Sequence, residues 1–222
     1  MTMSNGAQLL YLMDPQCGWC FGFSGTIHEI VAHYRTDERL KLTLITGGLF
    51  HPAMATRSKF AEEKRPIAAQ VSRQFGVRFS EDYFRNILAS GNLDSLVPCQ
   101  VINAVKITSP ESAFGFAERL IDAAFTEGRN ISELPVCLDV VQEGSLKREE
   151  VESILLTPEV GMLTEESFEF ARRVGTGFPS LYLKTERGLI HLGGTQLDLK
   201  TLKAEVDAQL NSVGTSAIIK KY

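Results

Sequence analysis

A short apolar segment that stops directly in front of two cysteines constrains the fold of this chain more than any other feature. Residues 8–13 are almost entirely apolar and end at Asp14-Pro15, where the proline has no N–H group to give to a sheet. After Cys17 and Cys20, apolar residues recur at spacings of three and four. We therefore predict a buried strand followed by an amphipathic helix that begins at the cysteines.

Further β-type patterns occur at residues 40–46 and near the C-terminus. Residues 40–46 alternate apolar and polar side chains, which predicts a second strand. Residues 180–184 and 189–192 predict a hairpin, and the apolar spacing in residues 199–210 predicts a last helix. Residues 212–222 show no clear pattern, and we expect them to fray.

The segment between these β-rich parts has helical periodicity. From about residue 52 to residue 164 we find no strand pattern, and the length suits four to six helices. Four helix starts are predicted at hydroxyl residues that can cap a helix: Ser80, Ser109, Ser145 and Thr164.

The predicted order of elements is β-α-β, a helical block, and β-β-α. This is the order of an α/β thioredoxin fold that is interrupted by a large all-helical insertion. We place the N-terminal half of the thioredoxin fold at residues 1–50, the helical insertion subdomain at residues 51–164 and the C-terminal half at residues 165–222.

Charge and hydropathy exclude several classes of protein. The net charge is −4 and no run of Lys and Arg occurs, so we expect no nucleic-acid partner. No stretch approaches the roughly 18 apolar residues of a membrane-spanning helix. The first residues also lack the basic and apolar segments of a secretory signal, which favours a cytoplasmic location.

The spacing of Cys17 and Cys20 suits disulfide exchange. The thiolate is the nucleophile, and the N–H groups and dipole at a helix N-terminus stabilise it on Cys17. Cys20 lies one turn further along the same side, so it can resolve a mixed disulfide formed by Cys17. Because Gly18 and Trp19 carry no charge, we expect only a moderate lowering of the Cys17 pKa, while Trp19 supplies apolar surface for a substrate.

The other cysteines and histidines leave alternatives open. A Cys-x-x-Cys pair is also half of a structural zinc site, but Cys99 and Cys137 are too far apart to complete one, so we expect no metal. Both lie among apolar residues, where they are either small core side chains or a second redox pair. His51 is the histidine whose loop is a candidate to approach the dithiol.

The motif Asp14-Pro-Gln-Cys-Gly-Trp-Cys-Phe-Gly, with Gly177-Phe-Pro-Ser downstream, resembles the DsbA-like thioredoxin superfamily over essentially the whole chain. It looks most like the cytoplasmic branch of FrnE-like proteins, also described as candidate protein-disulfide isomerases. The resemblance implies a thiol–disulfide oxidoreductase without a bound cofactor. Its partners would be protein or small-molecule thiols and disulfides, with glutathione or another thiol as redox partner; the direction of electron flow and the oligomeric state stay open.

The resemblance also implies residues that bind substrate. In this superfamily the proline that opens the third strand is cis and lies beside the dithiol, and the residue before it pairs with an extended substrate. These positions correspond to Pro179 and Phe178 in this chain. Together with Gly18 and Trp19, they form the expected substrate-binding set.

One position departs from the superfamily pattern. Related proteins carry a buried acid six residues before the first cysteine, where it assists proton transfer at the second cysteine, and this chain has Tyr11 there. Asp14, Tyr11 or water then takes over this role, or proton transfer is less assisted.

Two other functions compete with disulfide exchange. The kappa-class glutathione transferases and related isomerases share the helical insertion but have a serine at the position of Cys17, and they bind glutathione as a cofactor. The presence of both cysteines in this chain favours redox chemistry over a glutathione-dependent transferase or isomerase. A zinc-holding or chaperone-like module without enzymatic activity is the third possibility.

Overall fold

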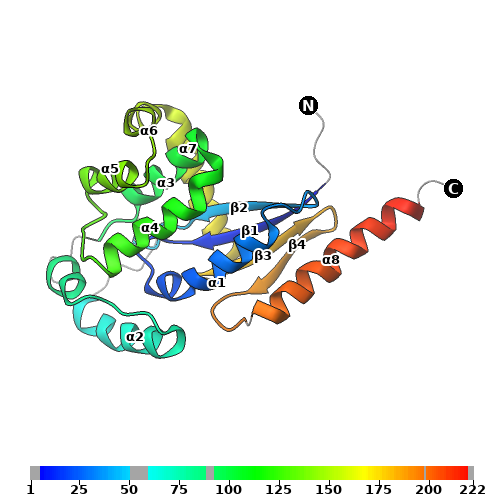
Figure 1. The fold of residues 1–222 in the computed structure, drawn as a ribbon, viewed down its shortest axis with the longest axis horizontal. Helices are drawn as coiled ribbons and strands as arrows, with labels where there is room; N and C mark the ends of the chain where they lie inside the picture. The colour runs from blue at the N-terminus through cyan, green and yellow to red at the C-terminus, as the bar shows by residue number, and fades with distance from the viewer. Residues whose placement is uncertain (1–5, 51–59, 89–92, 198, 220–222) are drawn as a thin grey trace.

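We describe the protein from a computed structural model, which covers residues 6–50, 60–88, 93–197 and 199–219 (Figure 1). A four-stranded sheet in the order β2-β1-β3-β4 forms its centre. Strands β1 (Ala7–Met13) and β2 (Leu40–Thr46) are parallel, whereas β3 (Ser180–Thr185) is antiparallel to both β1 and β4 (Gly188–Gly193). The predicted α/β thioredoxin fold is confirmed.

The sheet buries both faces because β1 is apolar on both sides. Its residues Leu9, Tyr11 and Met13 belong to the main core, which also includes residues of α1 (Gly18–Tyr34) and α8 (Leu199–Ile219). The alternate residues Leu10 and Leu12 pack in a smaller cluster with Ala171 of α7 (Pro158–Val174). The chain therefore places α1 and α7 on opposite faces of the strand that leads to the dithiol.

The segment between β2 and α7 is helical in the parts that the structure describes. Its α-helices are α2 (Phe60–Phe75), α3 (Leu96–Thr108), α4 (Ala113–Phe125), α5 (Leu134–Glu143) and α6 (Arg148–Leu155). A π-helical turn covers Tyr83–Leu88 and a 3-10 turn covers Pro110–Ser112. In Figure 1, α2 extends below the sheet while α5 and α6 lie at the opposite end.

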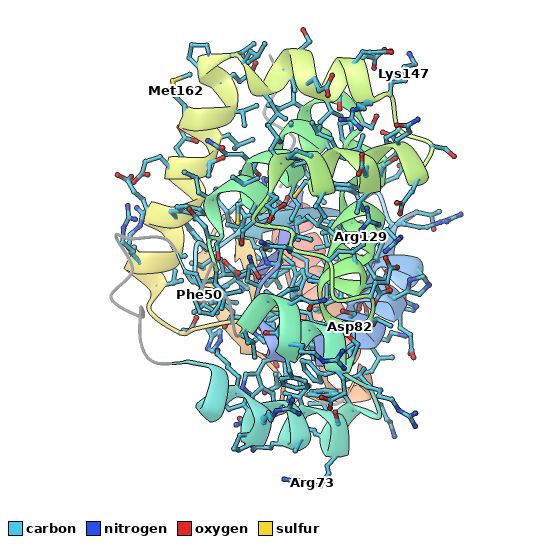
Figure 2. All side chains as sticks on the ribbon, turned by 90° about the vertical axis from the view of Figure 1, so that its left-hand side faces the viewer. Phe50, Arg73, Asp82, Arg129, Lys147 and Met162 are labelled. Atoms are coloured by element: carbon cyan, nitrogen blue, oxygen red, sulfur yellow. The ribbon has the colours of Figure 1, made fainter. Side chains whose placement is uncertain are left out.

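Figure 2 shows the same separation from the side. Met162 of α7 and Lys147, just ahead of α6, lie at one end of the molecule, and Arg73 of α2 lies at the other. Arg73, Lys147 and Met162 all lie within residues 51–164, so the predicted insertion contributes to both ends of the molecule. The boundaries predicted at residues 50 and 164 remain predictions, and α7 continues through residue 164 without a break.

Two predicted helix starts differ from the structure, at Ser145 and Thr164. Ser109 is the N-cap residue of the 3-10 turn that begins at Pro110 and leads directly into α4, as predicted, although its side chain makes no capping hydrogen bond. The α6 helix begins at Arg148 because Ser145 adopts a positive φ of 59°. Thr164 lies inside α7, where its hydroxyl donates to the carbonyl oxygen of Val160 at 2.7 Å. The α7 helix instead starts at Pro158, whose fixed φ suits the first helical turn.

The predicted helix start at Ser80 agrees with the structure, whereas the C-terminal helix is longer than predicted. Ser80 accepts a hydrogen bond from the N–H of Tyr83 at 3.1 Å, as expected of a helix cap. The last helix does not end near residue 212, because α8 continues to Ile219. Among the described residues, no helix is long and apolar enough to cross a membrane.

Candidate active site

Cys17 occupies the N-cap position of α1, as the sequence predicts. Its backbone is extended, with φ −89° and ψ 113°, and its carbonyl oxygen accepts the N–H of Phe21 at 3.1 Å. Cys20 lies one turn further into the helix and has no exposed surface, whereas Cys17 is 5% exposed as a residue. Of the two cysteines, Cys17 lines the cavity described below and Cys20 does not.

The local hydrogen bonds give the two thiols different acidities. The backbone N–H groups of Trp19 and Cys20 and the Cys20 thiol all donate to the Cys17 sulfur. These bonds, led by the thiol, lower the pKa of Cys17 although burial and the Asp14 charge oppose them. Burial, followed by the Cys17 contact, raises the pKa of Cys20 well above its ordinary value. The thiolate therefore resides on Cys17.

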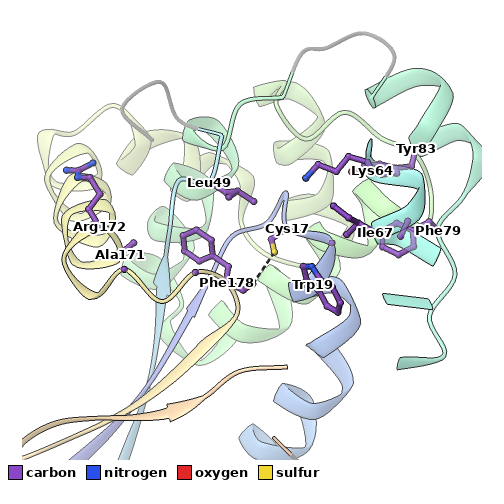
Figure 3. A pocket seen from close by; sticks show the side chains of 14 residues that line it. Cys17, Trp19, Leu49, Lys64, Ile67, Phe79, Tyr83, Ala171, Arg172 and Phe178 are labelled. Carbon is purple, nitrogen blue, oxygen red and sulfur yellow. Dashed lines mark hydrogen bonds between the residues drawn. The ribbon is translucent and has the colours of Figure 1, made fainter. Parts of the chain in front are cut away.

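Phe178 and Pro179 reach this site from the far end of the chain. The carbonyl oxygen of Phe178 lies 3.7 Å from Cys17 Sγ, and the Phe178–Pro179 peptide bond is cis, as the resemblance implies (Figure 3). The strand β3 begins at the next residue, Ser180. An extended segment that ends beside the reactive sulfur is suited to pairing with the backbone of a substrate.

Asp14 is a buried carboxylate that holds three segments together. It accepts the N–H of Gln16 at 2.8 Å, the N–H of Leu49 at 2.6 Å and the hydroxyl of Ser95 at 3.0 Å. Burial raises its pKa from 3.8 to about 6, although these donors lower it. The side-chain amide of Gln16 in turn donates to Ser132 Oγ at 2.8 Å. The loop before Cys17 is therefore anchored to the end of β2 and to the helical segment.

Tyr11 occupies the position of the missing buried acid. This residue is 5% exposed and lies close enough to Cys20 and Cys17 for their charges to act on its hydroxyl. Burial, with smaller effects from Cys20 and Cys17, raises the pKa of Tyr11 well above its ordinary value. A neutral phenol hence lies near the dithiol at the position where related proteins have a carboxyl group.

An apolar cavity of about 540 Å³ opens over Cys17. Figure 3 shows it between the loop at Phe178, the start of α1 and helix α2, from which Lys64 extends toward Cys17. The predicted substrate-binding residues Gly18, Trp19 and Phe178 line it. Lys64, Phe79 and Tyr83 also line the cavity, but they belong to the helical segment, where no sequence motif predicts a site.

The two other cysteines lie outside this cavity and are buried. Cys99 is close to Thr46 and the glycines after it, and burial raises its pKa well above the ordinary value. The Cys137 thiol donates to the carbonyl oxygen of Ile131 at 3.0 Å, and burial raises its pKa to about 12. Both are free, buried thiols, as are Cys17 and Cys20, so the choice between core side chains and a second redox pair stays a prediction.

Two further expectations concern metal ligands and His51. In the part of the chain that the structure describes, no group of three or more His, Cys, Asp and Glu side chains is arranged to hold a metal ion. His51 lies outside the described residues.

Comparison with known proteins identifies the fold. No protein-family model matches the chain and no curated protein matches its sequence. Among solved structures, the cytosolic disulfide reductase DsbM from Pseudomonas aeruginosa is 26% identical, with a TM-score of 0.74 over 92% of this chain and 98% of DsbM. The structure of DsbM with GSH is 27% identical, with a TM-score of 0.72 over 92% and 99% of the two chains.

A candidate protein disulfide isomerase from Nitrosomonas europaea has the same fold. It superposes with a TM-score of 0.79 at 20% identity, covering 93% of this chain and 98% of the other. The likeness to these proteins extends over nearly the full length of each, including the helical segment between β2 and α7. The chain belongs to the DsbA-like thioredoxin superfamily and is a thiol–disulfide oxidoreductase.

Proposed function

We propose that the chain reduces disulfides through Cys17 and Cys20 and that glutathione returns the electrons. The observation that carries this proposal is the difference between the two sulfurs: the Cys17 pKa is lowered at the floor of the cavity, and that of Cys20 is raised behind it. A low pKa provides the attacking thiolate at neutral pH, and the buried thiol next to it waits to resolve the product.

The reaction proceeds in two exchanges. The Cys17 thiolate attacks one sulfur of the substrate disulfide, which forms a mixed disulfide and releases the other substrate sulfur as a thiolate. Cys20 then loses its proton and attacks the Cys17 sulfur, which releases the second substrate thiolate and leaves a Cys17–Cys20 disulfide. Two glutathione molecules reduce this disulfide and become one glutathione disulfide.

Asp14 favours reduction over oxidation. A strongly stabilised Cys17 thiolate favours the reduced enzyme and makes a dithiol a strong oxidant. Here the Asp14 carboxylate opposes the stabilisation of Cys17 by the backbone N–H groups and by Cys20. Burial and, to a smaller extent, the Asp14 charge thus keep the Cys17 pKa higher than those donors alone would set it, which suits a protein that passes electrons to substrates. A reducing cytoplasm is the compartment we propose, supported by the likeness to cytosolic DsbM.

The lining of the cavity supports glutathione as the thiol partner. Glutathione carries two carboxylates, and the cationic side chains of Lys64 and Arg172 line an otherwise largely apolar cavity. Arg172 also pairs with Glu165 at 2.7 Å, and the Lys64 ammonium lies 5.0 Å from the centroid of the Phe50 ring. The DsbM structure with GSH supports the same assignment by similarity. Protein disulfides that dock along Phe178 are the second class of substrate.

A glutathione-dependent reductase assay tests this function. The wild type is expected to reduce a small mixed disulfide, and the reaction is monitored through the consumption of glutathione. This activity is expected to be lost in Cys17→Ser. Lys64→Met should raise the KM for glutathione severalfold, whereas Lys41→Met, on the exposed surface of β2, should leave it unchanged. Transfer of glutathione to a small electrophile that survives Cys20→Ser would instead favour the transferase alternative.

A further inference from the structure

A groove of about 600 Å³ lies on the face of the sheet that packs against α7. Leu10 of β1 and Ile45 of β2 line it from the sheet, Phe170 and Val174 of α7 form one side, and the β3–β4 hairpin contributes the other. None of the described residues that line this groove also lines the substrate cavity, so the two are separate. Its volume lies within the usual range of small-molecule sites.

The surface of the groove is largely apolar and partly open to solvent. Leu10 is buried, at 5% exposure, while Ile45, Phe170 and Val174 are only partly buried. Leu189 of β4, which also lines the groove, is 43% exposed, although large apolar side chains are usually covered. A ligand with an apolar chain would therefore remove apolar protein surface from water here.

The charged side chains of the groove are cationic. Arg173 of α7 and Lys184 of β3 line it, and none of the described lining residues is Asp or Glu. Lys41 of β2 lies on the same face of the sheet, because Lys41 and Lys184 both stand opposite Gln8 of β1. The groove thus combines an apolar surface with positive charge, although the chain as a whole has a net charge of −4.

The cations of the groove are available to a ligand. Arg172, one residue earlier in α7, pairs with Glu165 at 2.7 Å. Arg173 and Lys184, by contrast, are exposed and form no ion pair with a carboxylate in the part of the chain that the structure describes. A guanidinium group binds a carboxylate through two parallel hydrogen bonds, and an ammonium group adds a point charge.

We propose that this groove binds a long-chain carboxylate, such as a free fatty acid. The carboxylate lies between Arg173 and Lys184, and the apolar chain lies along Leu10, Ile45 and Leu189. One acidic head on one apolar chain matches both the charge and the small volume of the groove. This inference goes beyond disulfide exchange and does not depend on it, because neither Cys17 nor Cys20 lines the groove.

The substrate cavity is the competing place for the same ligand. It is also largely apolar, and it carries the cationic side chains of Lys64 and Arg172. The two places meet at the last turn of α7, where Arg172 belongs to the cavity and Arg173 to the groove. Replacement of one cation from each place therefore distinguishes them, with Lys64→Met as the matched control for Arg173→Met.

Isothermal titration calorimetry with laurate, kept below its micelle concentration, tests the proposal. We expect the wild type to bind one laurate per chain. Arg173→Met and Lys184→Met should each weaken binding about fivefold, the size expected for one partly exposed charge contact, and Lys64→Met should leave the affinity unchanged. Leu189→Asp, which adds an acid at the exposed side of the groove, should weaken binding as well. Far-UV circular dichroism verifies that each variant is folded.

A cationic amphiphile with the same chain, dodecyltrimethylammonium, tests the role of charge and should bind at least about fivefold more weakly than laurate. Absence of laurate binding by the wild type would overturn the proposal, as would equal affinity for the two amphiphiles. An affinity lowered by Lys64→Met but not by Arg173→Met would also overturn it, because the ligand would then occupy the substrate cavity. Binding to phosphatidylglycerol vesicles without binding of laurate would assign the groove to a membrane surface instead and overturn it.

The failure of this proposal and that of the proposed function are distinguishable. Cys17→Ser is expected to lose disulfide reduction and to bind laurate with the affinity of the wild type, because Cys17 lies in the other cavity. Loss of laurate binding in a folded Cys17→Ser would therefore contradict the assignment of the ligand to the groove. A wild type that binds laurate but reduces no disulfide would contradict only the proposed function.

Discussion

Replacement of Asp14 by asparagine removes a buried charge beside the dithiol and keeps nearly the same shape. Burial raises the pKa of Asp14 from 3.8 to about 6, even though Leu49, Gln16 and Ser95 donate to it. The folded protein therefore binds this proton more tightly than the unfolded chain does. The contribution of Asp14 to stability is fully present below about pH 4 and is lost as the pH rises through 6.

The size of this effect follows from the shift in pKa. A difference of about two pH units between the folded and unfolded states corresponds to about 3 kcal/mol over the full range. Between pH 7 and pH 5, only part of the range is crossed, and the free energy of unfolding should rise by about 1 kcal/mol from Asp14 alone. Asparagine does not titrate, so Asp14→Asn lacks this rise.

Urea unfolding of the reduced wild type and of reduced Asp14→Asn at pH 5 and pH 7 measures this rise in the free energy of unfolding. Other titrating groups are common to the two proteins, so the difference between their pH dependences isolates Asp14. The Cys17 pKa gives a second reading, because the Asp14 charge raises it. In Asp14→Asn the midpoint of Cys17 alkylation against pH should move to lower pH.

The two readings have different consequences if they fail. Equal pH dependence of stability in the wild type and Asp14→Asn would refute the raised pKa of Asp14. An unchanged Cys17 alkylation midpoint would refute the argument that Asp14 limits the acidity of the nucleophile. Asp139→Asn is the matched control for both readings, since its carboxylate lies near the surface and pairs with Arg148.

Two further predictions concern packing around the site. A Cβ added at Gly47 would overlap the Phe178 ring, so Gly47→Ala should turn this ring into the substrate cavity. We expect kcat/KM for glutathione-dependent reduction to fall severalfold. Gly25→Ala is the control and should leave kcat/KM unchanged, because a Cβ there meets no atom within 4 Å. Cys99→Ala should lower the free energy of unfolding by about 1 kcal/mol. It should leave the redox equilibrium of Cys17 unchanged, and a shifted equilibrium would contradict the assignment of Cys99 to the core.

The main elements of the fold are predictable from the sequence because their signals are local. The apolar run before Asp14, the helix at the cysteines and the hairpin near residue 185 each depend on residues a few positions apart. The errors at Ser145 and Thr164 arise where capping residues and acids occur without a helix start. At Thr164, the proline at residue 158 determines the start of the helix instead.

The partners within the site depend on contacts between distant segments. The Asp14 carboxylate binds Leu49 and Ser95, which are 35 and 81 residues away, and no motif links these positions. Tyr11 marks a departure from the superfamily pattern, but only the fold shows that this residue is buried near the two cysteines and lines a second cavity. Phe178 was predicted from the resemblance, because 161 residues separate it from Cys17.

The most direct test of the central claim is the redox equilibrium of the Cys17–Cys20 pair. The protein is equilibrated with reduced and oxidised glutathione at a series of ratios, free thiols are trapped with an alkylating reagent, and each cysteine is assigned by mass spectrometry. We predict a single reversible two-electron transition between the dithiol and a Cys17–Cys20 disulfide, with Cys99 and Cys137 reduced throughout. If Cys17 and Cys20 formed no reversible disulfide at any ratio, disulfide reduction at this site would be contradicted.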